Sequence, residues 1–370
     1  MNPHHEGLFD QLMRDRWYTN TLFFCGSGLS LHAGIPLGGK LKARIIDAAS
    51  DGDAILRDAL ERVPFEGIME GMWHFRCREK TISRLFMSRH PTPGHTLLAY
   101  YLAYRMTNGT SGIGASAIAT TNFDRLFERA FLKLFSVRKH LPGVRLYSNL
   151  SIWDPVDRTI DTLTPERVYC QGARGRRGTI HHDKFDDYFL SKSSHGVPQS
   201  PLLIKLHSSL ELGNLGGGAY PQSLRRLGKH GLVYPLRFVF ADGPHTTVVV
   251  LGYSMSDDYD INPILRHLPA EDVSNKRIVY VHHKRGISAA NALRESKLPE
   301  PLRRFKGYTL TVDTDKLIGE LAMSIGLETP LVDFHPSDYL LSTIVSPLKR
   351  DRALRHDFCS YVLQYAKDSS

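Results

Sequence analysis

The stretch FFCGSGLSLHAGIPLGGK, residues 23–40, indicates the fold more directly than any other part of the sequence. The apolar run at 21–25 predicts a buried strand that passes directly into Gly26-Ser27-Gly28. Two glycines at this place let the backbone approach a pyrophosphate, and the amides that follow can point at its oxygens. A glycine turn in any strand–helix unit has the same appearance, so phosphate binding and a simple turn are both open.

Two standard phosphate-binding motifs can be compared with this stretch, and neither matches. The dinucleotide fingerprint needs a third glycine where Leu31 stands. A Walker loop beginning at Gly34 would be followed by Leu41 instead of the Ser or Thr that holds Mg²⁺, and Pro36 removes one cradling amide. The sequence therefore favours neither a standard dehydrogenase nor a P-loop nucleotide hydrolase.

Short apolar runs alternate with helical patterns along the chain. Strands are predicted at residues 21–25, 116–120, 202–206, 237–240, 247–251, 277–281 and 308–312. Helices are predicted at residues 40–49, 81–88, 95–106, 125–134, 262–267, 289–296 and 316–325. Continuous apolar runs suit strands that are covered on both faces. We therefore expect an α/β fold, a Rossmann-like and mostly parallel sheet with helices on both faces.

Two regions interrupt this alternation. Residues 137–200 contain few long apolar runs and carry the basic cluster GARGRRG at 172–178. They predict an inserted smaller subdomain within a catalytic domain of residues 1–330. Residues 331–370 predict a helical C-terminal extension, a candidate contact for a second copy or a partner.

Polar residues follow three further predicted strands at the edge where α/β proteins bind ligands. They are Thr121, Asn122 and Asp124 after the second strand, His207 after the third, and Gly252, Tyr253 and Ser254 after the strand at 247–251. A histidine at such a place can act as a general base near neutral pH. The alternatives are that Asn122 or Asp124 caps the next helix and that His207 is structural.

Composition and charge exclude several classes of protein. The 370 residues carry 47 Lys and Arg against 38 Asp and Glu, a formal net charge of +9, which suits either an anionic partner or simply a somewhat basic enzyme. The four cysteines form no C-x-x-C pair, and the 18 histidines are scattered, so we expect neither a disulfide framework nor a metal site. We also expect a cytoplasmic protein, because no signal peptide or membrane span is apparent.

Taken in order, these motifs resemble the sirtuin family, in its bacterial antiphage-defence branch that hydrolyses NAD⁺. The matching segments are Gly26-Ser27-Gly28-Leu29-Ser30 with Ala33-Gly34-Ile35-Pro36, then Thr121-Asn122-Phe123-Asp124, Lys205-Leu206-His207-Ser208 and Leu251-Gly252-Tyr253-Ser254. The segment Pro93-Gly94-His95 resembles the family's P-x-x-H helix start.

The resemblance implies a role for each matching residue. Asn122 would hold the nicotinamide ribose or the attacking water, Asp124 would help to position that site, and His207 would be the general base. The residues expected to bind the dinucleotide are Gly26, Ser27, Gly28, Ser30, Ile35, Pro36, Thr121, Gly252, Tyr253 and Ser254. No metal is expected, and NAD⁺ would be the substrate.

Departures from the family pattern bear on the reaction. The zinc cysteines of deacetylating sirtuins are absent, and Ser208 stands where those enzymes have Gly. This favours NAD⁺ hydrolysis over protein deacylation or ADP-ribosyl transfer. The resemblance further implies activation by oligomerisation or by a partner such as a HerA-type ATPase. A third hypothesis is a non-catalytic module that binds a nucleotide or a nucleic acid through Arg174, Arg176 and Arg177.

Overall fold

A computed structural model describes most of the chain. It describes residues 21–75, 86, 90–107, 117–122, 124–137, 144–148, 159–163, 178–179, 202–206, 232–233, 235–243, 245–256, 261–269, 273–324 and 338–369. His207, residues 81–85 of one predicted helix and nearly all of the basic cluster at 172–178 lie outside these ranges. None of the helices in these ranges combines the length and the hydrophobicity that a membrane span requires.

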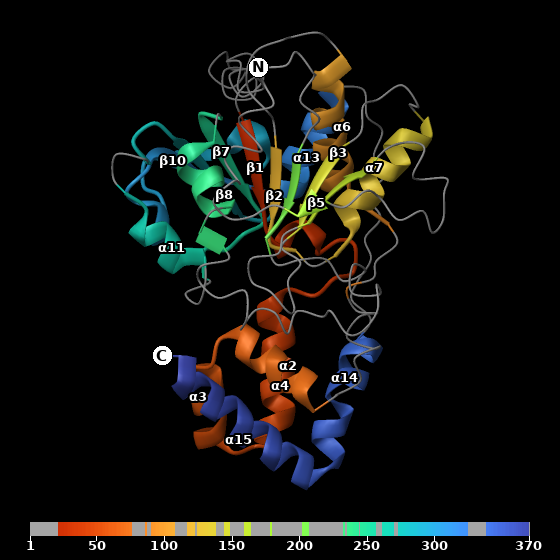
Figure 1. Cartoon of the computed structure of the whole chain (residues 1–370), viewed down its shortest axis with the longest axis vertical. Helices are drawn as coiled ribbons and strands as arrows, with labels where there is room; N and C mark the ends of the chain where they lie inside the picture. Colours follow the sequence, from red (N-terminus) through yellow and green to blue (C-terminus); the bar gives the residue numbers. More distant parts are fainter. Residues whose placement is uncertain are drawn as a thin grey trace.

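In the described part of the chain, a ten-stranded sheet forms the centre of the upper part of the molecule in Figure 1. Its strands are β1 (Thr21–Cys25), β2 (Ala117–Thr120), β3 (Val144–Ser148), β4 (Thr159–Leu163), β5 (Gly178–Thr179), β6 (Leu202–Lys205), β7 (Thr247–Leu251), β8 (Arg277–His283), β9 (Leu293–Glu295) and β10 (Lys306–Val312). In the described part of the chain, the order is β5-β4-β3-β6-β2-β1-β7-β8-β10-β9. Neighbours from β3 to β10 are parallel, and the outer strands β4, β5 and β9 pair antiparallel.

The register brings several strand ends to one edge of the sheet. Cys25 at the end of β1 pairs with Thr120 of β2 and with Leu251 of β7, and Thr120 in turn pairs with Lys205 of β6. Strands β2 to β6 lie on one side of β1 in the sheet, and strands β7 to β10 lie on its other side. The direction in which strands are added therefore reverses at β1, which makes this place the topological switch point of the sheet. Ligands of open α/β sheets bind at such a switch point.

Helices cover both faces of the sheet, as the sequence predicts. One face carries α6 (Pro93–Thr107), α7 (Leu126–Val137) and α13 (Thr314–Ser324). The other carries α11 (Ile261–His267) and the π-helix η6 (Phe238–Asp242). Short 3-10 helices are η2 (Ser27–Ser30), η7 (Ala289–Asn291) and η8 (Glu300–Leu302). The expected Rossmann-like α/β fold is therefore confirmed.

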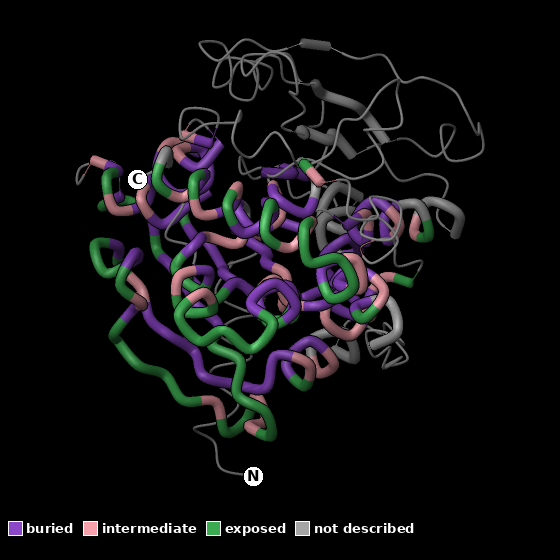
Figure 2. The backbone as a smooth tube through the Cα atoms, turned by 90° about the horizontal axis from the view of Figure 1, so that it is seen from below, coloured by how far each residue is buried: buried purple, intermediate pink, exposed green. Residues whose placement is uncertain are grey.

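A second group of helices lies beyond the carboxyl edge of the sheet and has its own apolar core (Figure 1). It consists of α2 (Gly38–Ser50), α3 (Ala54–Glu61), α4 (Phe65–His74), α14 (Asp338–Arg350) and α15 (Arg352–Ser369). We call this group the helical module. The C-terminal helices thus pack on helices that follow β1. Figure 2 shows buried residues running through the interior and exposed residues on outer helix turns and loops.

Two predicted elements are wrong. Residues 237–240, predicted as a strand, belong to a helical segment whose end is the π-helix η6. An apolar run of this length does not distinguish a buried strand from a buried helix. Residues 289–296, predicted as a helix, form η7 and the edge strand β9, which pairs with β10. Sheet pairing outweighs the helix propensity of this segment.

Candidate functional site

Two glycine turns meet back to back at the switch point. The Gly26 amide donates to the Leu251 carbonyl at 2.9 Å, and the Gly28 amide donates to the Gly252 carbonyl at 2.8 Å. A β-carbon on Gly26 would lie 2.5 Å from the Gly252 oxygen. Gly252 itself has φ +64°, and a β-carbon there would lie 2.5 Å from the Leu29 nitrogen. These glycines are needed for the contact between the turns, and the amides of Gly26 and Gly28 are already bonded within it.

The segment after β2 lies directly against the first of these turns. The Thr121 amide donates to the Cys25 carbonyl at 3.1 Å, so this residue continues the sheet. The Asn122 side-chain nitrogen donates to the Gly26 carbonyl at 3.1 Å and to Ser30 Oγ at 2.9 Å. Because a carbonyl can only accept, the bond to Gly26 fixes which end of the Asn122 amide is nitrogen.

This orientation leaves the carbonyl end of the Asn122 side chain available. Asn122 is 5% exposed, and its Oδ1 has no hydrogen-bond partner among the described residues. A buried carbonyl oxygen without a donor is uncommon in native proteins and costs free energy. The site therefore contains an oriented, buried acceptor whose chemistry suits a hydroxyl group or a water molecule.

Asp124 has two roles in the local structure. Its Oδ1 accepts from the Leu126 amide at 3.0 Å at the start of α7, which is helix capping. Its Oδ2 accepts from Ser30 Oγ at 2.7 Å. Capping therefore accounts for one carboxylate oxygen, and the other oxygen ties the segment after β2 to η2.

A buried histidine lies beneath this network. His95 Nδ1 is 2.7 Å from Thr92 Oγ1, and its Nε2 is 3.4 Å from Ser30 Oγ. Burial, reinforced by the positive charge of Lys205, lowers the pKa of His95 to about 3. The imidazole is therefore neutral at physiological pH and acts as a hydrogen-bonding group.

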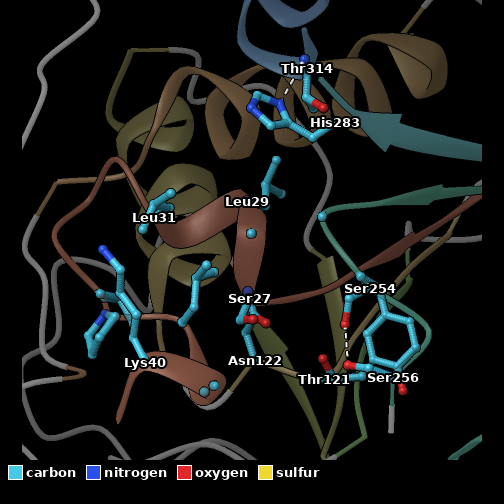
Figure 3. Close-up of a pocket in the computed structure, with 18 of the residues that line it drawn as sticks. Ser27, Leu29, Leu31, Lys40, Thr121, Asn122, Ser254, Ser256, His283 and Thr314 are labelled. Carbon is cyan, nitrogen blue, oxygen red and sulfur yellow. Dashed lines mark hydrogen bonds between the residues drawn. The ribbon is translucent and has the colours of Figure 1, made fainter. Parts of the chain in front are cut away.

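A cavity of about 1100 Å³ opens between the strand ends and the helical module (Figure 3). Small-molecule pockets typically have volumes of about 300–1,000 Å³, so this cavity is large enough for an extended ligand. The sheet side contributes Ser27, Gly28, Thr121, Asn122, Asp124, Gly252, Tyr253, Ser254 and Ser256. The helical module and the segment before it contribute Ile35, Pro36, Lys40, Lys42, Glu61, Arg62 and Phe65.

The part of the cavity beside β8 and α13 is rich in titratable groups. His32 Nε2 lies 2.7 Å from Asp315 Oδ2. His283, Asp313 and Asp315 bring possible metal-ligand atoms within 4.8 Å of one another. Burial raises the pKa of Asp313, but backbone N–H groups of Gly286, Lys316 and Asp315 outweigh it and lower that pKa. Asp313 thus caps α13 and Asp315 pairs with His32, so we assign no metal here.

Most residues predicted for the site line the cavity. Those that do are Ser27, Gly28, Ile35, Pro36, Thr121, Asn122, Asp124, Gly252, Tyr253 and Ser254. Gly26 and Ser30 lie behind it, where they bond to Asn122. His207 lies outside the described residues. Sequence reasoning missed the contributions of His32, His283 and Lys205, of which Lys205 alone carries a signal: it is a charged residue inside an apolar run.

Comparisons with known proteins do not identify a ligand or an activity for this chain. No family model matches the chain, and no curated protein matches it. Among solved structures, the chain is similar to Sir2Tm bound to a propionylated peptide, with a TM-score of 0.32 and 16% identity. That match covers 86% of this chain and 99% of the other. A similarity of this size does not indicate a ligand, so the ligand has to be inferred from the residues of the cavity.

Proposed function

We propose that the chain binds NAD⁺ in this cavity and hydrolyses it to nicotinamide and ADP-ribose. The cavity lies at the switch point of the sheet, the usual place for nucleotides in such folds. Lys40, Lys42 and Arg62 line it and would attract the anionic pyrophosphate. The proposal agrees with the motif resemblance and with the net charge of +9.

The observation that carries the proposal is the oriented carboxamide of Asn122. When the bond between ribose and nicotinamide breaks, its electron pair leaves with nicotinamide and the ribose C1′ becomes cation-like. A fixed carbonyl dipole next to that carbon stabilises positive charge, or orients the hydroxyl or water that bonds to it. Asn122 Oδ1 meets this need because both side-chain N–H groups are committed to Gly26 and Ser30.

The remaining steps need a proton acceptor. Water adds to C1′ and releases one proton, so NAD⁺ and water give nicotinamide, ADP-ribose and a proton. We assign this proton to His207, as the motif resemblance implies. His207 follows Lys205 by two positions, and the Lys205 end of β6 is in register with the Thr120 end of β2, which carries Asn122. No metal is needed for these steps.

We extend the proposal to the biological role. The motif resemblance supports an effector of bacterial antiphage defence that depletes NAD⁺. It also supports activation by oligomerisation or by a partner such as a HerA-type ATPase. In the cell, such an effector would be silent until assembly.

The test is to incubate the purified chain with NAD⁺, alone and with candidate partners, and to measure nicotinamide and ADP-ribose by chromatography. We expect equal amounts of the two products. Turnover should fall by about 100-fold or more in Asn122→Ala. The control Asn291→Ala, which changes an exposed residue, should keep the turnover of the wild type. Turnover that requires an acyl-lysine peptide would indicate a deacylase, and a labelled protein acceptor would indicate a transferase. No release in any assembly state would contradict the proposal.

A further inference from the structure

A buried ion pair lies behind the cavity, between the two strand ends that carry the proposed catalytic residues. Lys205 Nζ lies 3.3 Å from Glu128 Oε1, and the two side chains are 0% and 2% exposed. Lys205 Nζ also donates to the backbone carbonyl of Asp124. Removing two charges from water costs several kcal/mol per ion, so a buried pair is weak evidence for a role in stability alone.

The pair joins separate parts of the fold. Lys205 is the last residue of β6, and Glu128 lies in the first turn of α7, where a carboxylate also interacts favourably with the helix dipole. Lys205 therefore ties β6, which leads to His207, to the segment that connects β2 with α7. Asn122 and Asp124 belong to that segment.

A chain of hydrogen bonds continues from the pair to the proposed reaction centre. Lys205 bonds to the Asp124 backbone, the Asp124 carboxylate accepts from Ser30 Oγ at 2.7 Å, and Ser30 Oγ accepts from the Asn122 amide at 2.9 Å. A shift of the Asp124 backbone would therefore reach the Asn122 side chain through short bonds. Lys205 itself is fully buried and cannot touch a ligand.

We propose that Lys205 and Glu128 are positioning residues that hold the segment after β2, with Asn122, in register with the end of β6. The inference rests on the proposed function for its kinetic part. Other titratable groups near the pair are His95 and Arg125, which interact electrostatically with Glu128 or Lys205, and Arg129, which interacts with Arg125. Within this larger charged cluster, the Lys205–Glu128 pair links the end of β6 to the segment after β2.

Two variants separate positioning from stability. Lys205→Met leaves Glu128 buried without this partner, and we expect it to be strongly destabilised. Lys205→Met/Glu128→Gln removes both charges, so we expect its urea midpoint to return most of the way to that of the wild type. If the pair positions Asn122, the double variant still loses about 100-fold in kcat while its KM for NAD⁺ changes by less than about twofold. A pair that serves stability alone would give wild-type kcat in the double variant.

A second readout does not depend on turnover. Both hydrogens of the Asn122 side-chain amide are bonded, so NMR should show slow hydrogen exchange there in the wild type, with the signal identified by its loss in Asn122→Ala. We expect exchange about tenfold faster in the double variant. The Asn262 side-chain amide, which donates to the Met255 carbonyl at 2.8 Å, is the control and should not change.

The two readouts distinguish the failure of each proposal. Faster exchange at Asn122 together with no NAD⁺ cleavage by the wild type would overturn the proposed function and leave the positioning role supported. Cleavage by the wild type, with unchanged kcat and unchanged Asn122 exchange in the double variant, would overturn the positioning role. Faster exchange at Asn262 as well would mean general loosening and would also count against it.

Discussion

Two buried histidines make the stability of this protein depend on pH in a way that can be calculated. His95 and His245 each have a pKa lowered to about 3, and burial is the main cause in both cases. An unfolded chain has histidine pKa values of about 6.5. Between these values the unfolded chain binds protons that the folded chain does not, so stability falls as pH falls from about 6.5 towards 3.

The magnitude follows from the same values. Between pH 6 and pH 5, each of these histidines is mostly protonated in the unfolded chain and neutral in the folded one. One proton of difference changes the free energy of unfolding by about 1.4 kcal/mol per pH unit, so each residue contributes a loss of about 1 kcal/mol over this interval. The two together contribute about 2 kcal/mol, a substantial share of a typical stability of about 5–15 kcal/mol.

The perturbation is His245→Gln, because this residue precedes the start of β7, at the opposite end of that strand from the cavity, and its Nε2 contacts the Val239 carbonyl. Urea unfolding followed by circular dichroism at pH 6 and pH 5 gives the loss of stability in each variant. We expect the loss to be smaller by about 1 kcal/mol in His245→Gln. His356→Gln, whose side chain is 80% exposed, is the control and should behave as the wild type. An equal loss in wild type and His245→Gln would refute the claim that burial holds His245 neutral.

Two further predictions concern local geometry. Gly252→Ala should lower the free energy of unfolding by about 1–3 kcal/mol and impair ligand binding, because φ is +64° and the new β-carbon would meet the Leu29 nitrogen. Gly39→Ala, which has open space around it, should be neutral or stabilising, and thermal unfolding measures both variants. Asp53→Ala should cost about 1 kcal/mol in urea unfolding, because Asp53 accepts from the Ile55 and Leu56 amides at the start of α3; an unchanged midpoint would contradict this.

The arrangement of the strand ends was predictable from the sequence because parallel strands of similar length end at one edge. The runs at 21–25, 116–120, 202–206 and 247–251 correspond to β1, β2, β6 and β7, and their register brings the polar residues that follow β1, β2 and β7 to one cavity. Glycine spacing was also informative, although the reason differs. The glycines let two turns pack closely, and the amides of Gly26 and Gly28 are bonded within that contact.

The π-helix shows where a local pattern fails. Phe238, Val239 and Phe240 are all buried, so the run is apolar in either conformation. The helical form is stabilised by contacts at a spacing of five residues. The Gly243 amide donates to the Phe238 carbonyl at 3.0 Å, and Arg237 Nε donates to Asp242 at 2.8 Å. A spacing of five has no strong sequence signal, since π-helices are rare.

The helical module could not be predicted because its contacts join distant parts of the chain. Gly71 of α4 lies so close to α15 that a β-carbon there would be 2.4 Å from Val362. Nothing local to either helix indicates this approach. Lys205 is different, because a charged residue in the apolar run LLIKL requires a buried partner. The charged residue therefore predicts a buried partner, but only the fold identifies that partner as Glu128.

The central claim is that the cavity holds NAD⁺ with its nicotinamide ribose at Asn122. A crystal structure of the protein with the product ADP-ribose bound tests it most directly. We expect the ribose that carried nicotinamide to lie within hydrogen-bond distance of Asn122 Oδ1, and the pyrophosphate to lie between the turns that carry Ser27 and Ser254. ADP-ribose bound elsewhere, or bound in this cavity with that ribose away from Asn122, would contradict the proposed binding mode.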